Sequence, residues 1–115
     1  FSRTPPENLA GWAQFRCTTS DYLPIVGPVP DVERMIVDFH ALRSNARAPV
    51  TESGSYLKNL YINCGLGSRG LSYAPLTAEI LASDIANEFP PLERDLRLAM
   101  HPARFIIRDL KKRKL

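Results

Sequence analysis

The 115-residue sequence lacks the features that mark membrane proteins and metal-binding proteins. No apolar run approaches the roughly 18 residues that a bilayer-spanning helix needs, so we expect no membrane partner. The two cysteines, Cys17 and Cys64, form no C-x-x-C pair, and no cluster of histidine and cysteine has the spacing of a metal site. We therefore expect no bound metal, and two free thiols in a reducing, cytoplasmic compartment.

Several motifs of nucleophilic and phosphate-binding enzymes are also missing. No Gly-Lys-Ser/Thr follows the glycine-rich stretch at 65–70, which excludes a P-loop. A serine-hydrolase elbow requires Gly-x-Ser-x-Gly, whereas Leu66 stands two residues before Ser68. His40 and His101 have no evident partners, and we interpret both as surface or capping histidines rather than catalytic bases. We therefore assign no catalytic residue.

The chain begins without Met, in a polar and proline-bearing segment that lacks the pattern of a signal peptide. This beginning favours a piece of a longer protein. The length suits one small domain, and the composition is that of an ordinary globular protein.

Charge is distributed unevenly along the chain. The segment 101–115 holds six of the fifteen basic residues and one of the twelve acidic residues, so a mildly acidic body carries a basic end. Such an end favours a polyanion or an acidic protein face, and the alternative is a solvated, partly disordered terminus. The basic residues of this end are Arg104, Arg108, Lys111, Lys112, Arg113 and Lys114.

Local patterns in the first half predict a mixture of strands and helices. Residues 15–26 are typical of strand, turn and strand, with Pro24 limiting the second strand to an edge or a short piece. Asp31 is a good N-cap for a helix over about 32–42, where apolar residues recur at helical spacing. A polar loop is expected over 44–55.

The second half contains the clearest predicted helix. A short β-rich run at 60–64 leads into the glycine-rich stretch, and a helix is expected over about 74–88. Ser72 would cap this helix, with Pro75 tolerated in its first turn. A third helix is expected over about 92–100. The predicted fold class is therefore α+β.

The most specific local motif is Gly65-x-Gly67-x-x-Gly70 between a predicted strand and a predicted helix. Glycines allow a tight turn and close approach to a ligand, and a helix N-terminus offers free N–H groups with a positive dipole end. The motif favours a site for phosphate, carboxylate or another electron-rich group. A complete Rossmann site needs an acidic residue after a second strand, but Asp84 and Glu88 lie on the same predicted helix. The alternative is a tight connection that binds nothing.

Two stretches resemble flavin enzymes of the D-amino-acid oxidase and glycine oxidase superfamily. Phe-Arg-Cys-Thr-Thr-Ser-Asp at 15–21, followed by Leu-Pro-Ile-Val-Gly at 23–27, is similar to the superfamily's closing strands. Gly-Leu-Gly-Ser-Arg-Gly-Leu at 65–71 is similar to its second flavin-contacting loop, which precedes the final long helix. With the ending His-Pro-Ala-Arg-Phe at 101–105, these stretches most resemble the oxidoreductase half of bifunctional enzymes that modify the wobble uridine of tRNA.

The resemblance implies an α+β fragment of a two-domain FAD-dependent oxidoreductase. Residues 1–31 would end the substrate-domain sheet, 32–59 would form a helix and loop, 60–100 would end the FAD-binding domain, and 101–115 would be a basic tail. The family's FAD-holding Rossmann segment has no counterpart here. The chain would therefore need the remaining N-terminal part of its parent and would be inactive alone. The parent's other half resembles a methyltransferase that uses S-adenosylmethionine.

The resemblance also implies a reaction and its contacts. FAD would accept a hydride from the carbon beside the amine of a carboxymethylaminomethyl uridine, and hydrolysis would leave an aminomethyl group that the methyltransferase half would methylate. Arg16 and Arg69 would bind the substrate, Arg16 by holding both oxygens of its carboxylate with the planar guanidinium, and the alternative for Arg69 is a contact with the flavin. The basic tail would contact tRNA phosphates. Contacts with FAD would come from Gly65, Leu66, Gly67, Ser68, Gly70 and Leu71.

Two alternatives from other functional classes remain open at this point. A free-standing binding module would use its basic end on RNA or on an acidic protein. A small structural domain would self-associate through apolar surface that no other part of the protein covers.

Overall fold

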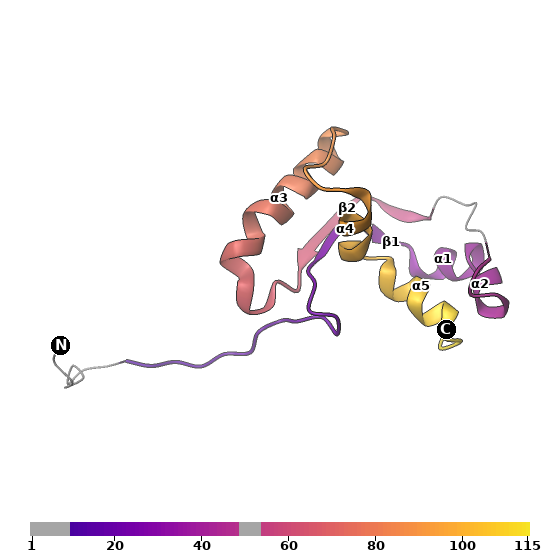
Figure 1. The fold of residues 1–115 in the computed structure, drawn as a ribbon, viewed down its shortest axis with the longest axis horizontal. Helices are drawn as coiled ribbons and strands as arrows, with labels where there is room; N and C mark the ends of the chain where they lie inside the picture. Colours follow the sequence, from indigo (N-terminus) through magenta and orange to yellow (C-terminus); the bar gives the residue numbers. More distant parts are fainter. Residues whose placement is uncertain (1–9, 49–53) are drawn as a thin grey trace.

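The computed structural model of the chain describes residues 10–48 and 54–115. Figure 1 shows an extended N-terminal segment leading into a body in which a two-stranded sheet lies between α3 on one side and a group of short helices on the other. The element order is β1 (Ile25–Pro30), α1 (Val32–Asp38), α2 (Ala41–Ser44), β2 (Tyr56–Cys64), the 3₁₀ turn η1 (Gly67–Arg69), α3 (Gly70–Ala86), α4 (Arg94–Met100) and α5 (Arg104–Lys111). The predicted α+β class is confirmed.

The sheet consists of β1 and β2 in antiparallel register. Ile25 pairs with Cys64 and Pro28 with Tyr61, and the register shifts between Pro28 and Pro30. β2 is four residues longer at its start than the predicted run, and it crosses the predicted division after residue 59. The ladder therefore joins segments that the resemblance assigned to different domains.

The strand predicted at the start of 15–26 is wrong, apart from one bridging residue. Thr18 forms a single antiparallel bridge with Leu66, and residues 10–17 belong to no regular element. The reason lies in the partner strand: β2 ends at Cys64, and the chain enters η1 at Gly67, so the ladder has no further backbone to pair with. The second predicted strand exists as β1, which begins directly after Pro24.

The helix predicted over 32–42 is broken in two. Its N-cap is confirmed, because an Asp31 carboxylate oxygen accepts a hydrogen bond of 3.2 Å from the Arg34 backbone N–H. The backbone leaves helical geometry at Phe39, whose φ is −105° and ψ 17°, and α2 begins two residues later. His40 lies at this break, exposed, with Nδ1 2.9 Å from the Val37 carbonyl oxygen, which fits its interpretation as a surface histidine.

The basic end is a helix rather than a solvated tail. One face of α5 buries Ile106 and Leu110 against α1 and α2. Apolar residues at helical spacing form the buried face of this helix. The helix was not predicted, because basic residues surround these apolar positions in the sequence. The shared core of this helical cluster, formed by α1, α2 and α5, consists of Met35, Phe39, Leu42, Ala103, Ile106 and Leu110.

A second core lies between β1, α3 and α4, around Val26, Ile80 and Met100. α3 begins at Gly70, four residues before the predicted start, because η1 leads directly into it. The predicted cap at Ser72 is therefore wrong, and Pro75 lies within the helix. None of the helices in the described ranges is long and apolar enough to cross a membrane.

Candidate functional site

The glycine loop, residues 65–70, turns through left-handed backbone at two positions. Gly65 has a φ of 71° and Gly67 a φ of 58°, a region that other residues enter at a cost. A Cβ at Gly65 would lie 3.0 Å from Cγ2 of Thr19, and one at Gly67 would lie 3.2 Å from Cγ2 of Thr18. Both glycines are therefore required by conformation and by close packing. Gly70, in contrast, is helical with a φ of −53°.

The segment before β1 lies directly against this loop. The Gly67 backbone N–H donates a hydrogen bond of 3.1 Å to the Cys17 carbonyl oxygen. Thr18 and Leu66 form the isolated bridge beside it. The Gly67 N–H is consequently used inside the chain, so a ligand at the loop must find other donors.

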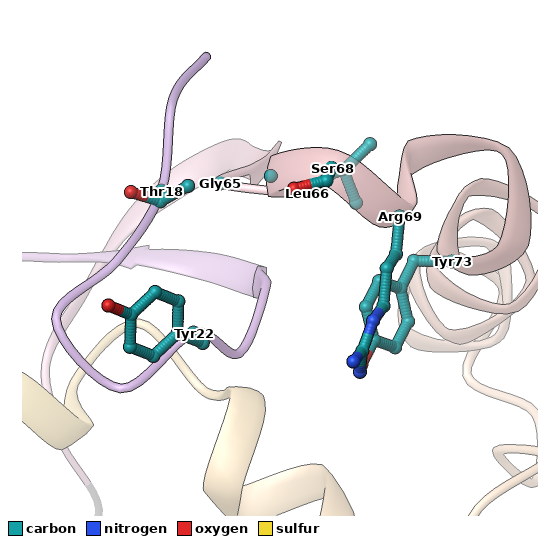
Figure 2. A pocket seen from close by; sticks show the side chains of 8 residues that line it. Thr18, Tyr22, Gly65, Leu66, Ser68, Arg69 and Tyr73 are labelled. Carbon is teal, nitrogen blue, oxygen red and sulfur yellow. The ribbon is translucent and has the colours of Figure 1, made fainter.

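A cavity of about 220 Å³ opens where the loop meets this segment. Figure 2 shows the Tyr22 ring on one side and the Arg69 and Tyr73 side chains together on the other. Hydroxyl groups, a guanidinium and glycine backbone surround the space, which suits one edge of a planar ligand that carries hydrogen-bond acceptors or negative charge. The lining residues are Thr18, Tyr22, Gly65, Leu66, Gly67, Ser68, Arg69 and Tyr73.

The structure brings together part of the predicted contact set. Gly70 and Leu71 begin α3 without lining the cavity, and the Leu71 side chain is 98% exposed. Arg16 is exposed in the extended segment and also lies outside the cavity lining. The predicted residues that do line the cavity are Gly65, Leu66, Gly67, Ser68 and Arg69.

Three lining residues were not predicted: Thr18, Tyr22 and Tyr73. Thr18 and Tyr22 belong to the stretch that carries the flavin-enzyme resemblance, but no local pattern assigns them a role. Tyr73 lies four residues after Arg69, a spacing that places side chains on one face of a helix. That spacing was a usable signal for Tyr73.

The Asp21 carboxylate, one residue before the cavity-lining Tyr22, is held by α5. The Arg104 guanidinium donates to Asp21 from Nε at 2.9 Å and from Nη2 at 3.0 Å. This paired guanidinium holds the pKa of Asp21 well below its usual range, so the carboxylate is ionised throughout the neutral range. Arg104, a predicted tRNA contact, is therefore engaged within the chain, and its side chain is only 13% exposed.

The other basic residues of α5 lie further out. The Arg108 guanidinium stacks 4.8 Å from the centre of the Phe105 ring and donates to Ser20 Oγ at 3.2 Å. The residues beyond it form an exposed basic surface at the end of the chain: Lys111, Lys112, Arg113 and Lys114.

A second polar cluster lies between β2, α3 and α4. Arg97 pairs with Asp84, and the His101 ring meets the Tyr56 ring edge-on at 5.6 Å. His101 Nδ1 accepts from the Ala103 N–H at 3.2 Å, so this ring nitrogen is used in the turn between α4 and α5. Burial, followed by the nearby Arg97 charge, lowers the pKa of His101. Across 10–48 and 54–115, no group of three or more His, Cys, Asp or Glu is arranged to hold a metal ion.

Comparison with known proteins assigns a family to this loop and its surroundings. The FAD dependent oxidoreductase (DAO) family matches residues 3–83. This range contains the whole cavity lining, from Thr18 to Tyr73.

Curated relatives share high identity with the chain along nearly all its length. The tRNA 5-methylaminomethyl-2-thiouridine biosynthesis bifunctional protein MnmC of Chromobacterium violaceum is 45% identical over 100% of the chain and 17% of its own length. The protein of that name from Pseudomonas syringae pv. tomato is 49% identical over 92% of the chain and 16% of its own length. That from Saccharophagus degradans is 42% identical over 96% of the chain and 16% of its own length. The chain thus spans about a sixth of the length of the curated relatives it matches.

Proposed function

Because the chain belongs to the FAD dependent oxidoreductase family, we propose that it forms one flavin-contacting edge of an enzyme that modifies tRNA. The relatives' shared name concerns the biosynthesis of 5-methylaminomethyl-2-thiouridine in tRNA. In the proposed reaction, the CH–NH bond of a carboxymethylaminomethyl uridine is oxidised to an imine, and hydrolysis by water then releases the carboxymethyl carbons and leaves the aminomethyl uridine. The observation that carries the proposal is the cavity built on the glycine loop, inside the range of the family match.

The residues around the cavity suit one part of FAD rather than the whole cofactor. At about 220 Å³, the cavity is smaller than the roughly 300–1,000 Å³ typical of ligand pockets, so other parts of the protein must hold the rest. Left-handed Gly65 and Gly67 bring backbone close to the ligand position without a side chain. FAD, when bound, supplies the acceptor for a hydride from the carbon beside the substrate's amine. This chain's contribution is to position one edge of the ring system.

Arg69 is the cation that lines the cavity, and we assign it to negative charge there. Its exposed guanidinium lies beside Tyr73 in Figure 2, with room to reach an anionic ring edge or the substrate carboxylate. Arg16 keeps its proposed role as a carboxylate anchor, supported by its position two residues before Thr18. Residues two apart in an extended chain share one face, and Thr18 lines the cavity.

The rest of the proposed enzyme would complete the site from the N-terminal side. Trp12 and Phe15 are 84% and 106% exposed in the segment that leads to the cavity, so they offer a large apolar surface for further protein. The proposal includes an S-adenosylmethionine-dependent methyltransferase half that acts on the product amine. It also includes a cytoplasmic location, and tRNA phosphates bound by Arg108, Lys111, Lys112, Arg113 and Lys114.

The test replaces a loop glycine that has left-handed backbone and lies close to a neighbouring side chain. Gly67→Val, introduced into the full-length gene product that contains this chain, should empty the purified protein of flavin, because a Cβ there meets Thr18 at 3.2 Å on left-handed backbone. The measurement is the flavin-to-protein absorbance ratio. Gly11→Val is the matched control, because a Cβ at Gly11 meets nothing within 4 Å. A Gly67→Val protein that stays as yellow as the control would exclude the proposed flavin contact.

A further inference from the structure

We propose that Arg104 and Asp21 are a positioning pair, through which α5 holds the turn at 18–23 against the glycine loop and so sets the shape of the cavity. This inference rests on the proposed function only in taking the cavity as a contact for FAD. It adds a role for two residues that lie outside the cavity lining.

The geometry of the pair is that of a fixed fork. Arg104 approaches Asp21 with Nε and Nη2, each at about hydrogen-bond optimum, 2.9 and 3.0 Å. Nη2 also donates to the Leu23 carbonyl oxygen at 3.0 Å, and Nη1 donates to that of Met100 at 3.0 Å. The guanidinium lies 4.2 Å from the centre of the Phe105 ring. One side chain thus ties the turn to the end of α4 and the start of α5.

The Asp21 carboxylate organises the turn in which it lies. It accepts from the Leu23 N–H at 3.2 Å and lies 2.9 Å from Thr19 Oγ1. The Tyr22 N–H donates to the Thr19 carbonyl oxygen at 3.2 Å, and Tyr22 has a φ of 60°. A left-handed tyrosine persists only where its surroundings enforce that conformation. Asp21 contacts Thr19 and Leu23, which lie on either side of Tyr22 in the sequence, so its carboxylate holds the tyrosine in this conformation.

The position of this turn determines two features of the cavity, namely the Tyr22 wall and the packing against the glycine loop. Tyr22 forms one wall, opposite Arg69 and Tyr73 (Figure 2). Thr18 and Thr19 pack on the loop so closely that only glycine fits at their two contact points. A shift of the turn would therefore move the Tyr22 wall and the loop backbone together.

The chain offers a matched ion pair for comparison. Arg97 and Asp84 join α4 to α3, away from the cavity lining. Removing this second pair costs a similar type of interaction, so it controls for loss of stability alone. A positioning role predicts that the two pairs differ in their effect on FAD affinity.

The experiment measures the FAD dissociation constant of the apo form of the full-length gene product, by quenching of flavin fluorescence, together with the melting temperature of each apoprotein. Asp21→Asn should weaken FAD binding at least tenfold. Arg104→Lys should do the same, because an ammonium cannot hold two oxygens and a carbonyl in one plane. The double variant should be no weaker than the poorer single variant, since both changes break one unit. Asp84→Asn should stay within twofold of the unmodified protein.

Each outcome decides the inference. If Asp21→Asn and Asp84→Asn weaken FAD binding equally, at similar melting temperatures, the pair is structural only and the inference is overturned. If Gly67→Val loses FAD while Asp21→Asn and Arg104→Lys keep it, the positioning pair fails but the proposed function stands. If Gly67→Val also keeps FAD, the proposed function itself fails. Where Asp21→Asn is insoluble, Arg104→Lys decides by the same comparison.

Discussion

The helical cluster and the cavity side of this chain, residues 10–23 and 65–73, differ in how fully they bury their apolar residues. In the cluster, Met35 and Leu110 are both 0% exposed. On the cavity side, Phe15 and Leu71 present nearly their whole side chains to solvent. Helices close in space bury one another's faces in the first region, whereas the second has apolar groups without a covering layer among the described residues. The cluster thus buries its largest apolar side chains among the described residues, whereas the cavity side leaves such side chains exposed there, as the proposed contact with further protein requires.

The largest expected effect tests whether the cluster is self-sufficient. Leu110→Ala removes a fully buried side chain, which typically costs about 2–5 kcal/mol. Amide exchange in α1 and α5 of the full-length gene product should therefore accelerate at least about thirtyfold. The same truncation at an exposed position of α1, Val37→Ala, should change exchange there by less than about threefold, as expected for an exposed residue. Equal effects at Leu110 and Val37 would show that the buried core does not stabilise these helices.

A smaller effect is expected where the uncovered side meets the rest of the protein. If Phe15 is covered in the full-length gene product, Phe15→Ala should cost about 1.5–3 kcal/mol, the usual value of burying such a side chain. The melting temperature measures this, and Phe15→Leu, which keeps most of the apolar area, should retain most of the stability. A Phe15→Ala protein with the same melting temperature as the unmodified protein would show that this residue stays in solvent.

The smallest effect concerns the outer end of the helical cluster. Lys111, Lys112 and Lys114 are exposed, so each can contact a phosphate without loss of packing. The plot of log K against log salt concentration for tRNA binding has a negative slope. Changing all three lysines to Gln should make this slope shallower by up to about three. The single change Lys58→Gln, on exposed β2, is the control for charge alone and should leave the slope unaltered. An unchanged slope in the triple variant would exclude tRNA contact by these lysines.

Local sequence signals predicted the elements that depend on local chemistry. The N-cap at Asp31, the strand leading into the glycine loop and the helix after that loop all follow from turn residues, β-rich runs or helical spacing. The position of α5 was missed because its apolar face is narrow and lies among basic residues. The break at Phe39 was missed because the apolar spacing continues through it to Leu42.

The site was predicted on one side only. The glycine loop has a recognisable spacing, so the sequence drew attention to the loop residues that line the cavity: Gly65, Leu66, Gly67, Ser68 and Arg69. The opposing turn is held by Arg104, 83 residues from Asp21, and no window of sequence contains both. Contacts of this kind depend on tertiary packing, which neither periodicity nor motif spacing encodes.

The same separation in sequence has a consequence for how the protein is made. A nascent chain leaves the ribosome from its N-terminus, so the turn carrying Asp21 emerges long before Arg104 does. The entropic cost of closing a loop rises with its length, and contacts between residues far apart in sequence form slowly. Until translation passes Arg104, the cavity wall at Tyr22 has no guanidinium to hold it. A ribosome that stops before α5 would therefore release a chain that has the glycine loop but not the guanidinium that fixes the opposite wall.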